Sequence, residues 1–225
     1  LATMRAAILG GFLFRLGIGA LPFLLPLLMQ IGFGLSPFQS GLVTFASAVG
    51  AMGMKTLAGR IIRTFGFRNM MTANALVSTV FLAACALFTI HTPLLLIMII
   101  LVVGGFFRSL EFTAINTVAY AEVEPAQMSR ATTLVSVNQQ LAISAGVAVG
   151  AFSVETTMWW RHATALDATV FAPAFVVVSI ISTASAWFFW QMPADAGHEI
   201  SGRKAIEVSS RKSEASAKAS AAVKT

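Results

Sequence analysis

Residues 94–121 read LLLIMIILVVGGFFRSLEFTAINTVAYA, and this segment is the most informative one for the fold class of the chain. It is long and apolar enough to cross a bilayer as one helix, since about 20 apolar residues span about 30 Å of hydrocarbon. Arg108 and Glu111 interrupt the stretch. Ionisable side chains inside a spanning helix are costly and mark a functional site by default. Their spacing of three residues places them on one helical face, close enough to pair.

The composition predicts an all-α integral membrane protein. The chain has 225 residues, of which 57% are hydrophobic and only 11% are charged, whereas a soluble domain carries about 25% charged residues. The net charge of +6 comes from bases at the ends of apolar stretches and in the C-terminal segment, which favours an anionic membrane surface over nucleic acid as the partner. Cys85 is the single cysteine, so the sequence predicts no disulfide framework, no metal cluster and no cofactor.

The apolar stretches predict one domain, residues 1–192, with six helical spans that form a transmembrane bundle. Local signals separate these spans. Ser36 can cap the second span, with Pro37 at its first position and Gln39 completing a capping box. Pro22 and Pro26 lie inside the first span, where prolines are tolerated and produce kinks. The predicted spans are about 4–30, 37–57, 70–90, 93–121, 128–153 and 169–191.

Basic residues in short connections predict the orientation. The connection between the second and third spans carries four of them, Lys55, Arg60, Arg63 and Arg68. The opposite side has Arg161 alone. We therefore expect a multi-pass protein of the inner membrane with both termini in the cytoplasm. Residues 193–225, rich in Ser, Ala and Lys, predict a disordered cytoplasmic tail that is either solvated or in contact with anionic lipid.

A short internal similarity links the first and fourth spans. Gly10-Gly11-Phe12-Leu13-Phe14-Arg15 is similar to Gly104-Gly105-Phe106-Phe107-Arg108. Because three spans separate the two copies, they cross the membrane in opposite directions. This is the pattern of a three-plus-three inverted repeat, which builds many transporter folds. Chance similarity in a protein rich in glycine and phenylalanine is the alternative.

Five polar residues at span depth are candidates for lining a cavity or a transport route. Arg15 lies near the middle of the first span, and a stable helix accepts a central arginine only beside water, an acid or carbonyl groups. Arg108 and Glu111 either serve a cavity or form an intrahelical pair that makes the arginine tolerable. Asn116 and Gln139 either bind substrate or join neighbouring helices, a contact worth about 0.6 kcal/mol on average.

Small residues at helical spacing predict close contacts between helices. They occur in the second and fifth spans, at Ala46, Gly50, Gly53, Ala142, Gly146 and Gly150. Static packing and a rocking interface require the same contacts, so these residues identify neighbours and not an activity.

The sequence argues against an enzyme. His91 and His162 fall in short connections, and His198 lies in the C-terminal segment. No serine or cysteine is accompanied by a plausible base within the membrane, and no spacing of metal ligands occurs. An intramembrane enzyme has only the buried polar residues in its favour.

Three segments together resemble the major facilitator superfamily, specifically the C-terminal six-helix half of a fourteen-span multidrug/proton antiporter. The segments are 15–30, 59–68 and 105–120, and the resemblance covers all six spans. In the connection after the second span, Gly59, Gly66 and Arg68 match the family signature Gly-x-x-x-Asp-Arg-x-Gly-Arg-Arg. Arg63 occupies the Asp position and Thr64 the following Arg, so this loop lacks the acid that a charge-relay role requires. What remains is a tight turn permitted by glycine, with a basic face.

The resemblance implies a role for each span. First and fourth spans would line a central cavity, second and fifth would meet the other half, and third and sixth would face lipid. It further implies proton-coupled efflux of drugs or small amphipathic compounds by alternating access. The partners would be the lipid bilayer, a small-molecule substrate, protons, and a second six-helix half from the same longer chain or a homodimer.

The chain begins at Leu1, close to the edge of a span and without a methionine. We therefore expect a fragment of a longer protein, or an unusual start. One half supplies one wall of a cavity, so we expect that the chain alone does not transport. The alternative is a non-transporting truncated membrane protein, or an assembly module that needs a partner half.

Overall fold

The computed structural model of the chain describes residues 2–120, 123–163 and 165–193. In these parts the regular structure is helical, without a β-strand. The predicted tail lies outside the described residues from position 194 onward. The α-helices are α1 (Ala2–Gly19), α2 (Leu21–Leu27), α3 (Pro37–Lys55), α4 (Ala58–Phe65), α5 (Phe67–Ala84), α6 (Leu94–Tyr120), α7 (Met128–Arg161) and α8 (Ala168–Trp190).

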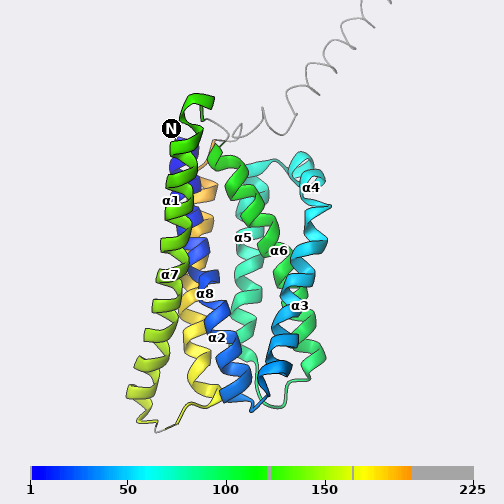
Figure 1. Cartoon of the computed structure of the whole chain (residues 1–225), viewed down its shortest axis with the longest axis vertical. Helices are drawn as coiled ribbons and strands as arrows, with labels where there is room; N and C mark the ends of the chain where they lie inside the picture. The colour runs from blue at the N-terminus through cyan, green and yellow to red at the C-terminus, as the bar shows by residue number, and fades with distance from the viewer. Residues whose placement is uncertain (1, 121–122, 164, 194–225) are drawn as a thin grey trace, which may run out of the picture.

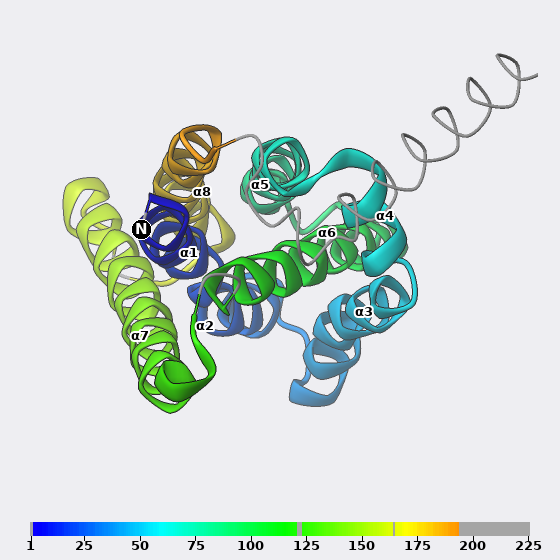
Figure 2. The same cartoon turned by 90° about the horizontal axis from the view of Figure 1, so that it is seen from above.

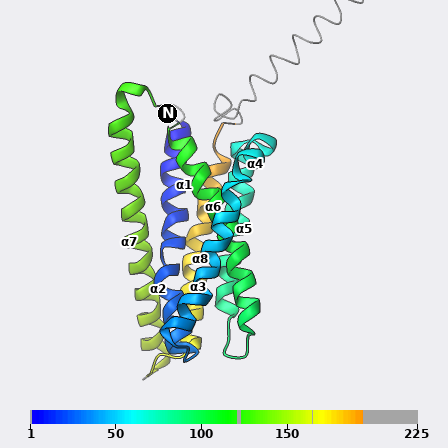
Figure 3. The ribbon, with the colours of Figure 1, turned by 45° about the vertical axis from the view of Figure 1, so that its right-hand side comes forward.

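The helices form one bundle in which long elements run alternately up and down (Figures 1 and 3). Five stretches in the described parts of the chain are long and apolar enough to cross a membrane: Arg5–Gly32, Phe67–Leu87, Leu94–Tyr120, Met128–Arg161 and Ala168–Trp190. The predicted second span, α3, is not among the five. It lies along α6 for most of its length and completes the bundle (Figure 1). The chain is a multi-pass, all-α membrane protein.

Helix pairing follows the pattern of a three-plus-three repeat. The helix α1 packs against α7 and α8, and its counterpart α6 packs against α3 and α5. Exchanging the first three spans with the last three converts each pair into the other. The copies differ in that α7 also packs against α8, whereas α3 and α5 make no comparable contact within the described residues.

Glycines allow the closest approaches between paired helices. A Cβ atom on Gly50 of α3 would lie 2.7 Å from the Val102 carbonyl carbon of α6. One on Gly146 of α7 would lie 3.0 Å from the Leu16 carbonyl carbon of α1. Ala46 and Ala142 are buried, and Gly150 faces Ala20 and Leu24. Gly53, in contrast, is exposed and meets open space.

The helix boundaries follow local signals where these are strong. The Ser36 hydroxyl accepts from the Gln39 backbone N–H and the Gln39 side chain accepts from the Ser36 N–H, so the predicted capping box at α3 is confirmed. The first span is interrupted at Ala20, between α1 and α2, and Pro22 lies in the first turn after this break. It ends in a π-helical turn, Leu28–Gly32.

Two segments differ from the sequence-based prediction. The helix α7 runs to Arg161, about two turns past the predicted end at residue 153. No glycine or proline interrupts residues 154–161, and the helix stops where His162 adopts a left-handed conformation at φ 51°. The loop before the third span contains the short helix α4, so the predicted tight turn is confined to Gly66, where φ is 75°.

Candidate functional site

The Arg108 side chain points from α6 toward α3. It is half-buried, and its Nη2 donates to the Ser47 hydroxyl at 2.7 Å. Both residues line a cavity of about 360 Å³ between the first, second and fourth spans. The cavity is lined by Ile18, Leu21, Pro22, Leu25, Pro26, Thr44, Ser47 and Arg108.

The chemistry of this cavity is apolar with one cationic group. Arg108 is the single charged residue in its lining. A guanidinium has five N–H donors, and one of these is engaged by Ser47. Pro22 and Pro26 in the lining have no N–H to donate to the carbonyls four residues earlier, those of Ile18 and Pro22. The cavity can therefore hold an amphipathic molecule that accepts hydrogen bonds from the guanidinium.

Arg15 occupies a separate position, between α1 and α6. Its side chain is 1% exposed, and its Nη2 donates to Asn116 Oδ1 at 2.6 Å. The guanidinium carbon lies 5.5 Å from the centre of the Phe112 ring, within the range of a cation–π contact. Two of the predicted site residues, Arg15 and Asn116, are thus brought together, but outside the lining of the Arg108 cavity.

Glu111 points from α6 toward α5 and has no exposed surface. Its Oε2 accepts from Asn74 Nδ2 at 2.7 Å, and the same nitrogen donates to the Phe107 carbonyl at 2.9 Å. The intrahelical pair considered for Arg108 and Glu111 is not formed, because the two side chains bond to different neighbouring helices.

Gln139 is half-buried on α7, beside a row of exposed polar side chains. The row consists of Ser136, Gln140 and Ser144, spaced by four residues and therefore on one face of the helix. The neighbouring Asn138 turns inward and donates to the Ile8 carbonyl at 3.4 Å.

The three residues of the signature-like loop lie together at one end of the bundle. Gly59 is exposed near the start of α4, Gly66 joins α4 to α5, and Arg68 is half-buried in the first turn of α5.

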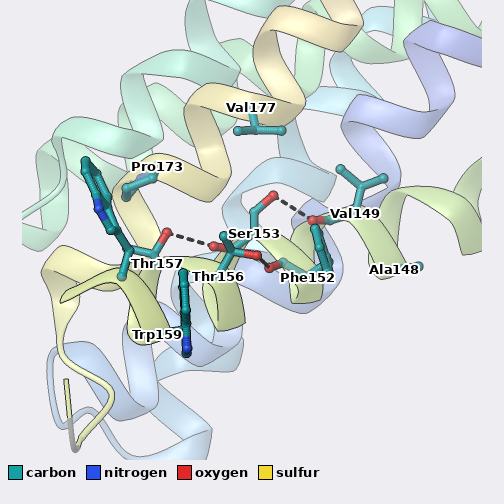
Figure 4. Close-up of a pocket in the computed structure, with 10 residues that line it drawn as sticks. Ala148, Val149, Phe152, Ser153, Thr156, Thr157, Trp159, Pro173 and Val177 are labelled. Carbon is teal, nitrogen blue, oxygen red and sulfur yellow. Dashed lines mark hydrogen bonds between the residues drawn. The ribbon is translucent and has the colours of Figure 1, made fainter. Parts of the chain in front are cut away.

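A second cavity, of about 630 Å³, lies between α7 and α8 (Figure 4). Its hydroxyl groups are occupied within α7: Ser153 donates to the Val149 carbonyl at 2.7 Å, and Thr157 donates to the Ser153 carbonyl at 2.7 Å (Figure 4). The remaining lining is largely apolar and ends at Trp159 and Trp160. Apart from the two indole N–H groups and the acceptor sites of the hydroxyls, this cavity offers an apolar surface.

No three His, Cys, Asp or Glu side chains of the described residues gather closely enough to hold a metal ion.

Comparison with known proteins decides the family. Residues 7–223 match the model of the Major Facilitator Superfamily. The chain belongs to the major facilitator superfamily.

Its relatives in the superfamily include proteins described as putative multidrug resistance protein MdtD. The one from Serratia proteamaculans is 30% identical over 197 residues, which cover 86% of this chain and 41% of the relative. That from Yersinia enterocolitica is 30% identical and covers 84% of this chain and 41% of the relative. The protein from Salmonella paratyphi B is 30% identical, and the match covers 86% of this chain and 42% of the relative. The chain therefore spans about two fifths of the length of the relatives that it matches.

Several residues of this superfamily member escaped the sequence-based prediction. Ser47 and Phe112 carry no distinguishing signal within their spans. Asn74 carries a recognisable signal, because it is an amide in a span that was otherwise expected to face lipid. Gln140 belongs to a polar cluster with Asn138 and Gln139 that is visible in the sequence, but the sequence does not show that Gln140 forms an exposed row with Ser136 and Ser144.

Proposed function

We propose that this chain forms one half of a transporter that exports drugs or other small amphipathic compounds by alternating access, in exchange for protons. Family membership and the names of the relatives support a transporter over an enzyme. The Arg108 cavity supports a substrate site, because it combines apolar walls with a few polar groups that can orient a ligand.

The polar row on α7 is the observation that carries the proposal. Ser136, Gln140 and Ser144 are exposed in the central part of a helix about 51 Å long. A polar group in hydrocarbon without a hydrogen-bond partner costs several kcal/mol. Figure 2 shows α3 and α7 on either side of α2 and α6, with α5 and α8 on the opposite side. The polar row of α7 suits water or another protein surface better than lipid, and we propose that it belongs to the face formed by α2, α3, α6 and α7.

A second six-helix half would cover this face and enclose the Arg108 cavity. It would come from the same longer chain or from a second copy. The coverage of about two fifths of each relative supports a longer chain. Apolar side chains on α3, namely Phe38, Leu42, Phe45, Val49 and Met52, are exposed and offer surface for this contact.

The proposed location is the inner membrane, with the N-terminus and the end of α8 on the cytoplasmic side. These ends lie at the same end of the bundle as α4 (Figure 1). Arg5, Lys55, Arg60 and Arg68 belong to this end, and Arg161 to the other. This distribution agrees with the excess of bases on cytoplasmic loops.

The test is export by the full-length protein that contains this chain, with Arg108→Ala as the variant. We expect export of an amphipathic dye to be lost while the amount of protein in the membrane is unchanged. Arg161→Ala is the matched control, since it removes an exposed arginine at the far end of α7. Full export by a well-expressed Arg108→Ala protein would contradict the assigned role.

A further inference from the structure

We propose that the Glu111 carboxyl is protonated and forms a paired amide–acid contact with Asn74, so that the interface between α5 and α6 is a proton-binding site. The protonation stands on the geometry alone. Its use in driving export rests on the function proposed above.

A count of hydrogen bonds carries the first step. The Asn74 amide nitrogen has two hydrogens, and both are used, one by the Phe107 carbonyl and one by Glu111 Oε2. Two buried acceptor atoms, Glu111 Oε1 and Asn74 Oδ1, are left without a partner. Buried polar atoms in proteins nearly always have a partner, so one hydrogen is missing from this contact.

A proton on Glu111 Oε1 supplies the missing hydrogen. A protonated carboxyl donates one hydrogen bond, and the Asn74 oxygen belongs to the amide whose nitrogen already bonds the other carboxyl oxygen. The acid and the amide then pair through both of their ends. An ionised carboxylate would leave both acceptors unpartnered.

The charges around Glu111 favour the same form. The titratable side chains described on α6 and on the elements packed against it, with Cys85 at the end of α5, are Arg5, Arg15, Lys55, Arg60, Arg68, Cys85, Arg108, Tyr120, Arg130, Glu155 and Arg161. None of them donates to the Glu111 carboxyl, whose one partner is Asn74. Arg15 is bonded to Asn116, and Arg108 to Ser47. The nearest end of α6, at Tyr120, is about 14 Å away along the helix, so an anion here would lie in the hydrocarbon layer without a counter-ion.

Asn74 connects the proton to the substrate cavity. Its amide also holds the Phe107 carbonyl, and Phe107 directly precedes Arg108. Loss of the proton to water would leave a carboxylate and two unpartnered acceptors in the interface, including the amide oxygen that now accepts from the acid. Separation of α5 from α6 would let water reach these atoms and would move the backbone that carries Arg108. Return of the proton from water would restore the closed contact.

The experiment is infrared difference spectroscopy of the purified full-length protein across a series of pH values. We expect a protonated-carboxyl band at neutral pH that is lost in Glu111→Gln. In Asn74→Ala the band should shift to higher frequency, because the carboxyl C=O loses its donor. Glu155→Gln, an exposed glutamate on α7, is the control and should leave the band unchanged.

Three results would overturn the proposal. The first is a neutral-pH spectrum identical in the wild type and Glu111→Gln. The second is a band insensitive to Asn74→Ala. The third is a change at constant pH on addition of sodium ions, which would make the site a sodium site.

A transport assay in vesicles separates this proposal from the proposed function. Glu111→Gln should keep downhill exchange of substrate and lose the stimulation by a pH gradient. A wild type that shows the band but transports nothing would refute the transporter function and leave the proton site standing. Retained stimulation in Glu111→Gln would refute the coupling role.

Discussion

Replacement of Gly50 by alanine tests the contact between α3 and α6 directly. The added Cβ would lie 2.7 Å from the Val102 carbonyl carbon, 3.0 Å from the Phe106 nitrogen, and closer still to the Val102 oxygen. These are backbone atoms of a long helix, so the two helices must separate. Overpacking of this kind costs about 1–3 kcal/mol, and between membrane helices packing is a main source of stability.

Gly53→Ala is the matched control for this substitution. Gly53 lies three residues further along the same helix, and a Cβ there meets nothing within 4 Å. Both variants make the same change in helix propensity, so their difference isolates the collision. We expect Gly50→Ala to be about 1–3 kcal/mol less stable than Gly53→Ala, which is roughly 5- to 150-fold in the unfolding equilibrium constant. The assay is reversible unfolding in mixed micelles, and equal stability of the two variants would refute the reasoning.

Two further predictions concern polar contacts. Asn116→Leu should destabilise the bundle by about 1.5–3 kcal/mol, because it removes the acceptor of the buried Arg15 guanidinium; Arg15→Met combined with Asn116→Leu should be much less destabilising, and additive losses in a double-mutant cycle would contradict this. Asp167 caps α8, and its hydrogen bonds from the Thr169 hydroxyl and then from the backbone of the same turn lower the pKa of its carboxyl. The pKa is lower in the folded state, so the stabilisation is present above the ordinary aspartate pKa of about 3.9 and is lost as pH falls through the folded value. Asp167→Ala should therefore lower the free energy of unfolding by about 1 kcal/mol at neutral pH and by progressively less in acid. If the loss of stability in Asp167→Asn depended on pH in the same way as the loss in Asp167→Ala, titration of this cap would be contradicted.

Sequence reasoning succeeded where the determining signal is local. The Ser36 capping box and Pro37 set the start of α3 within a few residues of chain, and the helix begins where they predict. It failed at the end of α7, which was predicted at residue 153 although nothing in residues 154–161 disrupts a helix.

The candidate site was predictable in its residues and not in its partners. An arginine or a glutamate inside an apolar span is visible in the sequence as an anomaly. The atom that satisfies it belongs to another helix, 61 residues away for Ser47 with Arg108 and 37 residues away for Asn74 with Glu111. From their spacing, Gly50 and Gly53 were both predicted to lie in a helix contact. The pairing of α3 with α6 shows that Gly50 is packed against α6 and that Gly53 faces open space.

The separation of Arg108 from Glu111 gives α6 its place in the proposed mechanism. Three residues along a helix correspond to a turn of about 300°, so the two side chains leave the axis about 60° apart. A direct pair would satisfy both charges within α6 and would be indifferent to the neighbouring helices. The observed contacts instead fix the rotation of α6 from two sides, through Ser47 on α3 and Asn74 on α5. A rotation of α6 that loosened one contact would strain the other. Proton release beside α5 would therefore change the position of Arg108 in the cavity beside α3, without any direct contact between the proton and the substrate.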